Sequence, residues 1–435
     1  NTGISGSDAR AKEANISGVI TVEAKNVVIN GIQLSGYGYI ALGNVDKVLI
    51  TNVYSTSAGL SKATDSGNRM GVIYSLSSKT NKNVTISDSY FNIGSTVYCH
   101  DAIMLYGTVT NLTVTGNYFT NSYGGATITE AVQATQISGN ITIDNNTFEF
   151  PTSNFVIMVG NYYNGANVTI SNNTISGKGS YTTAGIYVRY GSSGKTINII
   201  HNYISNMAGN CMDFRYAKAG STYNILFNSF DSKTAYKITY PGSATINYEG
   251  NYYASAQTTS TSDYNVITSL AEMEEAYRIW LLPSESLTLN ANGGQLSSNP
   301  TTYKVGLEVD LPTATKEHYT FAGWYTNPEF TGEAMTKILE STTGVLNLYA
   351  KFIPVEYTVT FKSEGYDDIV KTYTVENPTI EEPAVPTKTG YTGVWESYTL
   401  TNGNIEVNAV YTIINYIITF KANGEIVEII NYTIE

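Results

Sequence analysis

One short pattern returns nine times in the first 255 residues of the chain. In its fullest form it reads apolar-x-apolar-x-small-Asn-x, followed by an aromatic or aliphatic residue. The copies lie 21 to 36 residues apart, but the pattern itself keeps a constant length. Self-similarity at such a period is typical of a stacked repeat, in which loops take up the variation in length. The apolar pairs of the nine copies are Val27/Ile29, Val48/Ile50, Val84/Ile86, Leu112/Val114, Ile141/Ile143, Val168/Ile170, Ile197/Ile199, Tyr223/Ile225 and Ile246/Tyr248.

The period of two inside each copy predicts a β-strand with one apolar face and one face of Thr, Asn or Ser. Asn tolerates the left-handed backbone of a tight bend, and amides stacked about 4.8 Å apart can bond to one another as a ladder. The apolar columns and the asparagine column together predict a parallel β-helix, in which each rung buries its inward residues against its neighbours. The asparagines that share one position in six consecutive copies are Asn117, Asn146, Asn173, Asn202, Asn228 and Asn251.

The composition of the chain changes near residue 255. Residues 1–255 hold 15 Lys and Arg against 13 Asp and Glu, whereas residues 256–435 hold 9 against 23. Such a shift marks a boundary between separately folded units. Residues 256–285 combine a Ser- and Thr-rich stretch with apolar residues at helical spacing, from Leu270 to Trp280. Because a solenoid end exposes apolar core and strand edges, we expect a short capping helix over the last rung; a free linker helix is the alternative.

A second pattern occupies residues 286–353. Residues 287–294 read Leu-Thr-Leu-Asn-Ala-Asn-Gly-Gly, residues 319–326 read Tyr-Thr-Phe-Ala-Gly-Trp-Tyr-Thr, and residues 348–352 read Leu-Tyr-Ala-Lys-Phe. This segment resembles the Listeria–Bacteroides surface repeat, also called the internalin B-repeat. The resemblance implies a small β-grasp-like domain that occurs in tandem on bacterial cell-surface proteins.

The rest of the chain repeats this module. Residues 354–413 follow the same template in divergent form, with Tyr-Thr-Gly-Val-Trp at 391–395 and Val-Asn-Ala-Val-Tyr at 407–411. Residues 414–435 copy its beginning, and we interpret them as the truncated start of a further repeat. Residue 1 also falls inside an incomplete rung, so we interpret both ends as cut, and missing targeting signals carry no information.

The first 255 residues resemble, in repeat pattern only, the right-handed parallel β-helix group. This group includes pectate lyases, polygalacturonases, epimerases, phage tailspikes and adhesins, so the fold does not determine the function. The fold class that we expect is therefore all-β. A right-handed parallel β-helix with a short capping helix precedes tandem small β-grasp-like modules.

Charge and cysteine content narrow the range of partners. The formal net charge of −12 argues against nucleic acid and against an anionic membrane surface. No run of 18 apolar residues is present, so we expect no membrane span. Cys99 and Cys211 lie several rungs apart and cannot form a disulfide framework; we expect both to be small buried or semi-buried residues. Together with the surface-repeat resemblance, this predicts a protein that is secreted or displayed on a bacterial cell surface.

A second strand recurs in most rungs and suggests a ligand-binding face. Alignment of inward Val188, Phe214 and Ile238 places two columns outside, one with Tyr187, Asp213 and Lys237 and the other with Arg189, Arg215 and Thr239. Leu105, three rungs earlier by this alignment, joins the inward column. Aromatic rings cover sugar CH groups, and charged forks bind hydroxyls or carboxylates. The candidate ligand-binding residues are Tyr106, Tyr187, Arg189, Tyr190, Asp213, Arg215 and Lys237.

The same residues do not form a recognisable active site. A Ca²⁺ site takes six or more oxygens, whereas only Asp213 lies beside the two arginines. Hydrolases need two carboxylates about 5–9.5 Å apart, whereas Asp101 and Asp213 are expected at roughly 15–20 Å by rung count. Cys99 and His100 are adjacent on a strand and point to opposite faces. We therefore predict no catalytic residue, no metal site and no cofactor, with Ca²⁺ relevant only to a lyase.

Three functions remain open. The leading hypothesis is a non-catalytic, adhesin-like bacterial surface protein. Its β-helix would bind a polysaccharide, a host-surface glycan or a protein, and the repeat modules would form its stalk. The first alternative is a secreted polysaccharide lyase or glycoside hydrolase with accessory modules. The second is an architectural stalk or filament unit, in which the outer sheet face is simply solvated.

Overall fold

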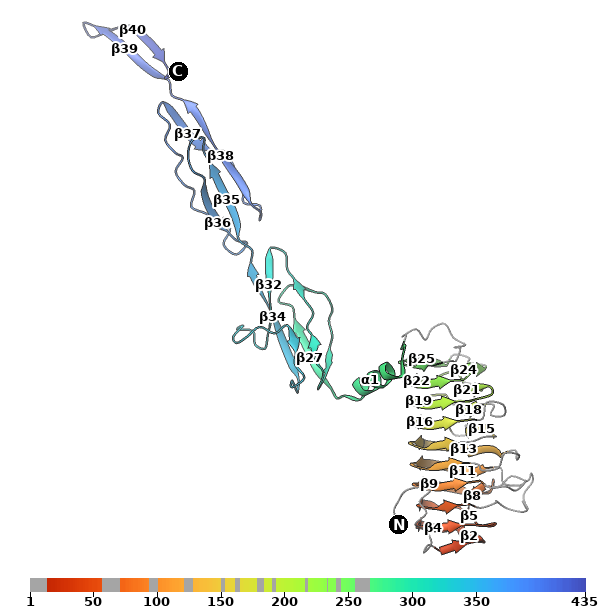
Figure 1. The fold of residues 1–435 in the computed structure, drawn as a ribbon. Helices are drawn as coiled ribbons and strands as arrows, with labels where there is room; N and C mark the ends of the chain where they lie inside the picture. Colours follow the sequence, from red (N-terminus) through yellow and green to blue (C-terminus); the bar gives the residue numbers. More distant parts are fainter. Residues whose placement is uncertain are drawn as a thin grey trace. The chain divides into compact units, whose positions relative to one another are not determined.

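The chain divides into two compact units, Asn1–Trp280 and Leu281–Glu435. The first is a stack of rungs with one helix, and the second consists of small sheets (Figure 1). The computed structural model describes residues 14–56, 71–93, 101–120, 128–149, 153–160, 165–177, 184–189, 193–215, 218–232, 234–239, 244–254 and 267–435.

Two parallel sheets form the rungs of the first unit. The smaller sheet has ten strands of two or three residues, each paired in parallel with the equivalent strand of the next rung. This arrangement confirms the expected β-helix. In spatial order the strands are β1 (Ala14–Ile16), β4 (Ile32–Leu34), β7 (Tyr54–Ser55), β10 (Tyr90–Asn92), β12 (Tyr118–Thr120), β14 (Thr147–Glu149), β17 (Thr174–Ser176), β20 (Tyr203–Ser205), β23 (Ser229–Asp231) and β26 (Tyr252–Tyr253).

The larger sheet has 16 strands in two runs, which the long strands β11 and β13 join. The first run is β2 (Val19–Val22), β5 (Tyr39–Leu42), β8 (Gly71–Ser75), β11 (Asp101–Thr115), β13 (Ile128–Asp144), β15 (Ser153–Gly160), β18 (Ala184–Arg189), β21 (Asn210–Arg215) and β24 (Thr234–Thr239). The second run is β3 (Lys25–Asn30), β6 (Asp46–Thr51), β9 (Thr80–Ser87), β11, β13, β16 (Ala166–Ser171), β19 (Thr196–Ile200), β22 (Thr222–Leu226) and β25 (Thr245–Glu249).

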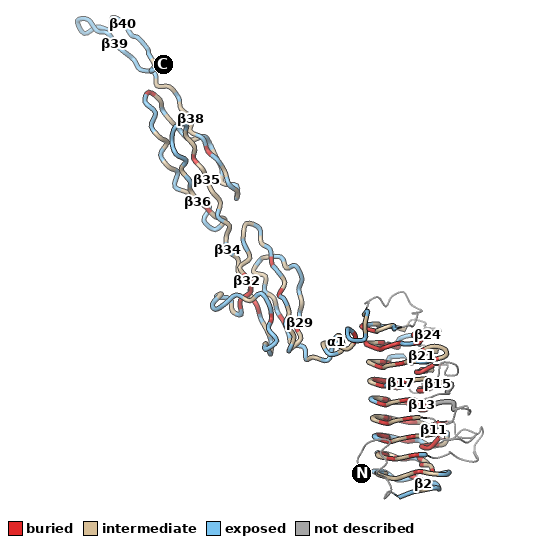
Figure 2. Tube along the Cα trace, in the orientation of Figure 1, coloured by how far each residue is buried: buried red, intermediate tan, exposed pale blue. Residues whose placement is uncertain are grey.

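The register of these sheets confirms the alignment of the nine sequence copies. Val27 pairs with Val48, and each later apolar pair lies opposite its equivalent in the next rung. The third apolar position forms a buried column, in which the rings of Phe91, Phe119 and Phe148 stack with centroids 5.1 and 4.7 Å apart. Figure 2 shows the resulting core as buried segments along successive rungs.

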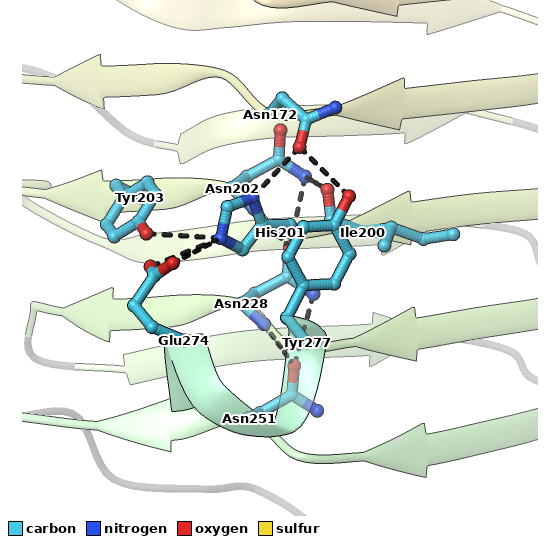
Figure 3. A network of polar contacts seen from close by, with 9 residues as sticks. All are labelled: Asn172, Ile200, His201, Asn202, Tyr203, Asn228, Asn251, Glu274 and Tyr277. Atoms are coloured by element: carbon cyan, nitrogen blue, oxygen red, sulfur yellow. Dashed lines mark hydrogen bonds and ion pairs between the residues drawn. The ribbon is translucent and has the colours of Figure 1, made fainter. Parts of the chain in front are cut away.

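The six asparagines form a continuous buried ladder. Each is at most 2% exposed, and the side-chain Nδ2 of each of the first five donates to the Oδ1 of the next asparagine at 2.9–3.1 Å. The backbone N–H of each of these five donates to that same oxygen. Figure 3 shows the end of this ladder, from Asn202 through Asn228 to Asn251. Both the column and its hydrogen bonds agree with the sequence prediction.

The left-handed residue of each turn is not the ladder asparagine, which corrects one expectation. Positive φ occurs at the preceding residue, for example 67° at Gly116, 54° at Asn172 and 53° at Phe227. The preceding residue therefore bends the chain. The asparagine that follows places its amide in the buried stack. This division of roles explains why the position before the asparagine holds mainly small or Asn residues.

A single described helix, α1 (Leu270–Leu281), follows the last rung. Its first turn is capped, because Ser269 Oγ accepts the N–H of Glu272 and the Glu272 carboxylate accepts the N–H of Thr268. The hydrogen bond from Thr268 lowers the pKa of Glu272. The sequence predicted a helix over the last rung, but the described contacts of the helix reach other rungs. Its side chains lie against the ladder corner of three rungs, at Asn172, His201 and Phe227.

The second unit contains two mixed four-stranded sheets and a hairpin. The central strands β27 and β34 are parallel, as are β35 and β38 in the next module, and the outer strands are antiparallel. The first module has β27 (Ser284–Asn290), β28 (Gln295–Leu296), β29 (Thr302–Lys304), β30 (Val309–Asp310), β31 (Ala314–Thr315), β32 (Tyr319–Tyr325), β33 (Lys337–Ile338) and β34 (Leu346–Pro354). The second has β35 (Tyr357–Lys362), β36 (Ile369–Tyr373), β37 (Tyr391–Trp395) and β38 (Ile405–Ile413), and the hairpin has β39 (Tyr416–Ala422) and β40 (Glu425–Tyr432).

The two modules keep the same hydrogen-bonded anchors despite their divergent sequences. The indole N–H of Trp324 donates to the carbonyl of Pro312 at 2.7 Å, and that of Trp395 donates to Pro383 at 2.7 Å. A tyrosine hydroxyl in each module also donates to a glycine carbonyl. The tyrosines are Tyr303, with Gly344, and Tyr373, with Gly403. The divergent module is therefore a structural repeat of the first.

We predict that Asn173→Leu will lower the free energy of unfolding of the first unit by more than about 2 kcal/mol. The substitution removes the acceptor of two Asn146 donors and leaves the Asn202 Oδ1 without its side-chain donor, Asn173 Nδ2. Urea denaturation followed by circular dichroism measures the change. Asn247→Leu is the control, since Asn247 is exposed and donates one side-chain bond to Asn224. Equal losses for the two variants would contradict a special role for the ladder.

We predict that residues 283–354 will fold when expressed alone. They contain their own buried core around Trp324, Leu348 and Ile338. The expected result is cooperative thermal unfolding with the emission maximum of a buried tryptophan. Trp324→Phe should lower the melting temperature, because it leaves the Pro312 carbonyl without its indole donor. A disordered fragment would show that this module depends on the rest of the chain.

Candidate functional site

The outer face of β18, β21 and β24 has the register that the sequence predicts. Tyr187 pairs with Asp213 and Asp213 with Lys237, while Arg189 pairs with Arg215. Val188 pairs with Phe214 and Phe214 with Ile238, and the side chains of Val188 and Phe214 are buried. Strand alternation therefore places the two predicted outward columns side by side.

The first outward column is longer than the sequence suggested. It continues from Tyr187 through Met158 and Gln133 to Met104. Leu105 consequently lies four strands from Phe214 rather than three. The extra strand belongs to β13. Its inward residues Val132 and Ala134 alternate with Gln133 and Thr135, but two small or medium apolar residues gave only a weak indication of a strand in the sequence.

This column faces outward but is buried. Gln133, Tyr187 and Asp213 are 1%, 3% and 2% exposed, and both methionines of the column are also buried. The ring of Phe155 stacks on Tyr187 with centroids 4.1 Å apart, and the guanidinium carbon of Arg215 lies 5.2 Å from the Tyr187 centroid. Tyr187 is thus packed against neighbours and does not offer a free ring face, in contrast to the surface role that we expected.

The second column is the more accessible one. Arg189 and Arg215 are half-buried, and Arg215 Nη2 donates to Asp213 Oδ2 at 3.0 Å. The side chain of Arg215 is 39% exposed and that of Asp213 is 3% exposed. Two guanidinium groups on adjacent strands repel each other, and the single carboxylate offsets part of that repulsion.

Of the remaining candidates, only Tyr106 has a described side chain. Tyr106 is 43% exposed on β11, three strands away from β18. Lys237 lies in β24 by its backbone, but its side chain is outside the described part of the structure, and Tyr190 lies wholly outside it. The described cluster therefore consists of Tyr187, Asp213 and Arg215, with Arg189 next to them in register.

Two buried oxygens in the first column lack a hydrogen-bond donor among the described residues. They are Oε1 of Gln133 and Oδ1 of Asp213. The amide nitrogen of Gln133 donates to the Met158 sulfur at 3.5 Å. Three strand spacings, about 14 Å, separate Gln133 from Asp213. Buried acceptors of this kind are normally satisfied by water or by a ligand, and here they fit hydroxyl or N–H donors.

The two carboxylates considered for catalysis, those of Asp101 and Asp213, lie far apart. Asp101 is buried at the start of β11, and four strand spacings, about 19 Å, separate its rung from that of Asp213. Cys99 and His100 lie outside the described residues. Within the described ranges, no three His, Cys, Asp or Glu side chains are close enough to hold a metal ion.

Cys211 is a buried core residue, as the sequence suggested. It is 0% exposed, and its Sγ lies 3.7 Å from the carbonyl oxygen of Ile204. Burial raises the pKa of the Cys211 thiol to about 12. The thiol is therefore protonated at neutral pH, and the reactive thiolate is scarce.

We predict that Cys211 of the native chain will resist alkylation by iodoacetamide at about pH 8. That pH lies about four units below the thiol pKa, so roughly one molecule in 10⁴ carries the thiolate. Mass spectrometry of the Cys211 peptide should show modification only after denaturation. Rapid labelling of the native chain would mean that the thiol is open to solvent.

Comparison with protein families identifies the two modules of the second unit. Residues 286–351 and 357–405 match the model of the Listeria–Bacteroides repeat domain. The match confirms the resemblance of the first module, and it extends to the divergent second module. The β-helix lies outside the matched residues.

Two bacterial relatives share short segments with this chain. A Gly-rich membrane protein of Evansella cellulosilytica is 32% identical over 115 residues, which are 26% of this chain and 13% of the relative. A second membrane protein of the same organism is 30% identical over 140 residues, which are 32% of this chain and 21% of the relative. The chain thus spans only a small part of either relative's length. Among the described residues of this chain, no helix is long and apolar enough to cross a membrane.

Among solved structures, the surface adhesin PfbA of Streptococcus pneumoniae is similar over 55% of this chain and 73% of its own. The sequence identity is 14% and the TM-score is 0.24. A TM-score this low supports no conclusion about this chain, whose β-helix is established by its own strand pairing.

Proposed function

We propose that the chain is part of an adhesin-like bacterial surface protein whose β-helix binds an acidic glycan. The observation that carries the proposal is the pair of half-buried arginines, Arg189 and Arg215, in register on adjacent strands. One carboxylate, Asp213, binds the guanidinium of Arg215, and Arg189 lies next to Arg215 in register. The local excess of positive charge suits a carboxylate or sulfate on the ligand.

Packing holds one of these arginines in place before any ligand binds. Asp213 binds the guanidinium of Arg215, and the Tyr187 ring lies beneath it. A preorganised cation loses less conformational freedom on binding than a free side chain does.

The tandem modules support a location on the cell surface. Both modules match the Listeria–Bacteroides repeat domain, and repeats of this kind occur in tandem on bacterial surface proteins. In this role they form a stalk that carries the β-helix. Secretion and surface display are parts of the proposal and follow from the module match, while the choice of a glycan follows from the arginine face.

We predict that Arg189→Ala with Arg215→Ala will abolish binding of the full chain to uronate-bearing or sulfated polysaccharides. The loss follows from removal of both charge-assisted hydrogen-bond donors. A glycan array measures binding, and thermal melting should show only a small decrease in melting temperature, because removal of the like-charge pair offsets part of the loss of the ion pair between Arg215 and Asp213. The control is Lys218→Ala with Arg278→Ala, which removes two cations elsewhere on the first unit and should bind as the parent does.

Two outcomes would reject this proposal. The first is a parent chain that binds no acidic glycan while the double arginine variant melts markedly lower, which would make the arginines structural. The second is cleavage of a uronate polymer, followed by ultraviolet absorbance with Ca²⁺ present, which would favour the lyase alternative.

A further inference from the structure

His201 links the ladder corner of the β-helix to helix α1. It is the turn residue before Asn202, with φ of 54°. Its Nδ1 lies 2.9 Å from Oδ1 of Asn172, and its Nε2 lies 3.1 and 3.2 Å from the two carboxylate oxygens of Glu274 (Figure 3). The ring also stacks on Tyr277 with centroids 3.8 Å apart. The imidazole is thus held between the preceding rung and the helix.

The neighbours of Asn172 determine which amide atom faces the imidazole. Asn172 Nδ2 donates to Asp144 Oδ1 at 2.8 Å, so its oxygen points toward His201 and the Tyr277 hydroxyl, which donates to it. An amide oxygen only accepts hydrogen bonds, and an ionised carboxylate such as that of Glu274 also only accepts. Both imidazole nitrogens must therefore carry hydrogen to satisfy both contacts. That form is the imidazolium cation.

We propose that His201 is a proton-controlled latch that holds helix α1 against the β-helix. When the imidazole is doubly protonated, it donates to Asn172 and Glu274 at the same time. When one proton leaves, a nitrogen lone pair faces one of these acceptors, and one bond between corner and helix is lost. The helix is thus held while the imidazole carries both protons and is loosened as the pH rises and one proton leaves.

The other titratable groups that face the ring come from both the helix and the rungs. They are Glu274 and Tyr277 of α1, Tyr203 of β20, whose hydroxyl lies 3.2 Å from Nε2, and Asp144, which is reached through Asn172. Burial raises the pKa of Tyr277. Arg278 is bound by Glu275 on the same helix.

Release of the helix would change the tether to the second unit. Helix α1 has 12 residues, and the second unit begins at Leu281. An isolated helix of this length is marginally stable in water. Docked, the segment spans about 18 Å; extended, it can span roughly 40 Å. The latch would therefore regulate the length of chain between the β-helix and the repeat modules, a role separate from ligand binding at the arginine face.

Amide hydrogen exchange of residues 270–281 in the full chain tests the proposal. Samples at about pH 5.5 and about pH 8 are compared by mass spectrometry, with labelling times scaled to the intrinsic exchange rate. Protection should be on the order of tenfold higher at the lower pH, the effect of one charge-assisted hydrogen bond. His201→Asn and Glu274→Gln should each remove this pH dependence. Asn suits the left-handed position, as Asn172 shows one rung earlier.

Glu275→Gln is the matched control, because Glu275 lies on the same helix and binds Arg278 instead of His201. It should keep the pH dependence of the parent chain. Equal protection of the parent at both pH values would overturn the proposal. So would a full pH response in Glu274→Gln. That variant decides the matter even if His201→Asn perturbs the turn, because Glu274 is a partly exposed side chain on the helix surface.

Discussion

The β-helix depends on the asparagine ladder more than on any other single interaction. Each ladder amide is buried and bonds to the neighbouring rung through both its side chain and its backbone, as at Asn146 and Asn173. A buried amide without these partners would cost about 1–3 kcal/mol for each lost group. The ladder therefore holds successive turns at one strand spacing. Once the turns are aligned, the apolar pairs on either side must stack in register, which is the pairing observed.

The same constraint explains how much of the molecule could be predicted. A fixed corner lets the sequence be aligned rung by rung, so the pairing of Tyr187 with Asp213 and of Arg189 with Arg215 was predictable. Burial of the outward column was not, because strand alternation gives the direction of a side chain but not what covers it. The strand around Gln133 was missed because its polar residues hid the alternation. The position of α1 was also not predicted, since the apolar spacing of a helix does not identify the surface against which the helix packs.

The docking of α1 depends on turn residues that break the small-residue pattern. Phe227 has φ of 53°, which is unfavourable for a bulky side chain. Its ring contacts Tyr277 and Trp280 of the helix, with centroids 5.7 Å away in both cases. It also lies over Gly250, where any Cβ would come within 2.4 Å of the ring. Glycine is thus required at Gly250, and the strained turn is offset by the aromatic surface that it provides for the helix.

The repeat modules show how a shared fold absorbs a change in length. The first module has one residue more between the start of its β32 strand and Trp324 than the second has between Tyr391 and Trp395. The register of β32 shifts between Phe321 and Gly323, whereas β37 pairs without a break. A β-bulge of this kind accommodates one extra residue in one strand. Both tryptophans consequently lie opposite an alanine, Ala350 or Ala409, and donate to equivalent proline carbonyls. The hydrogen-bonded indole is therefore the feature that the two sequences preserve, and the strand that carries it differs in length between the modules.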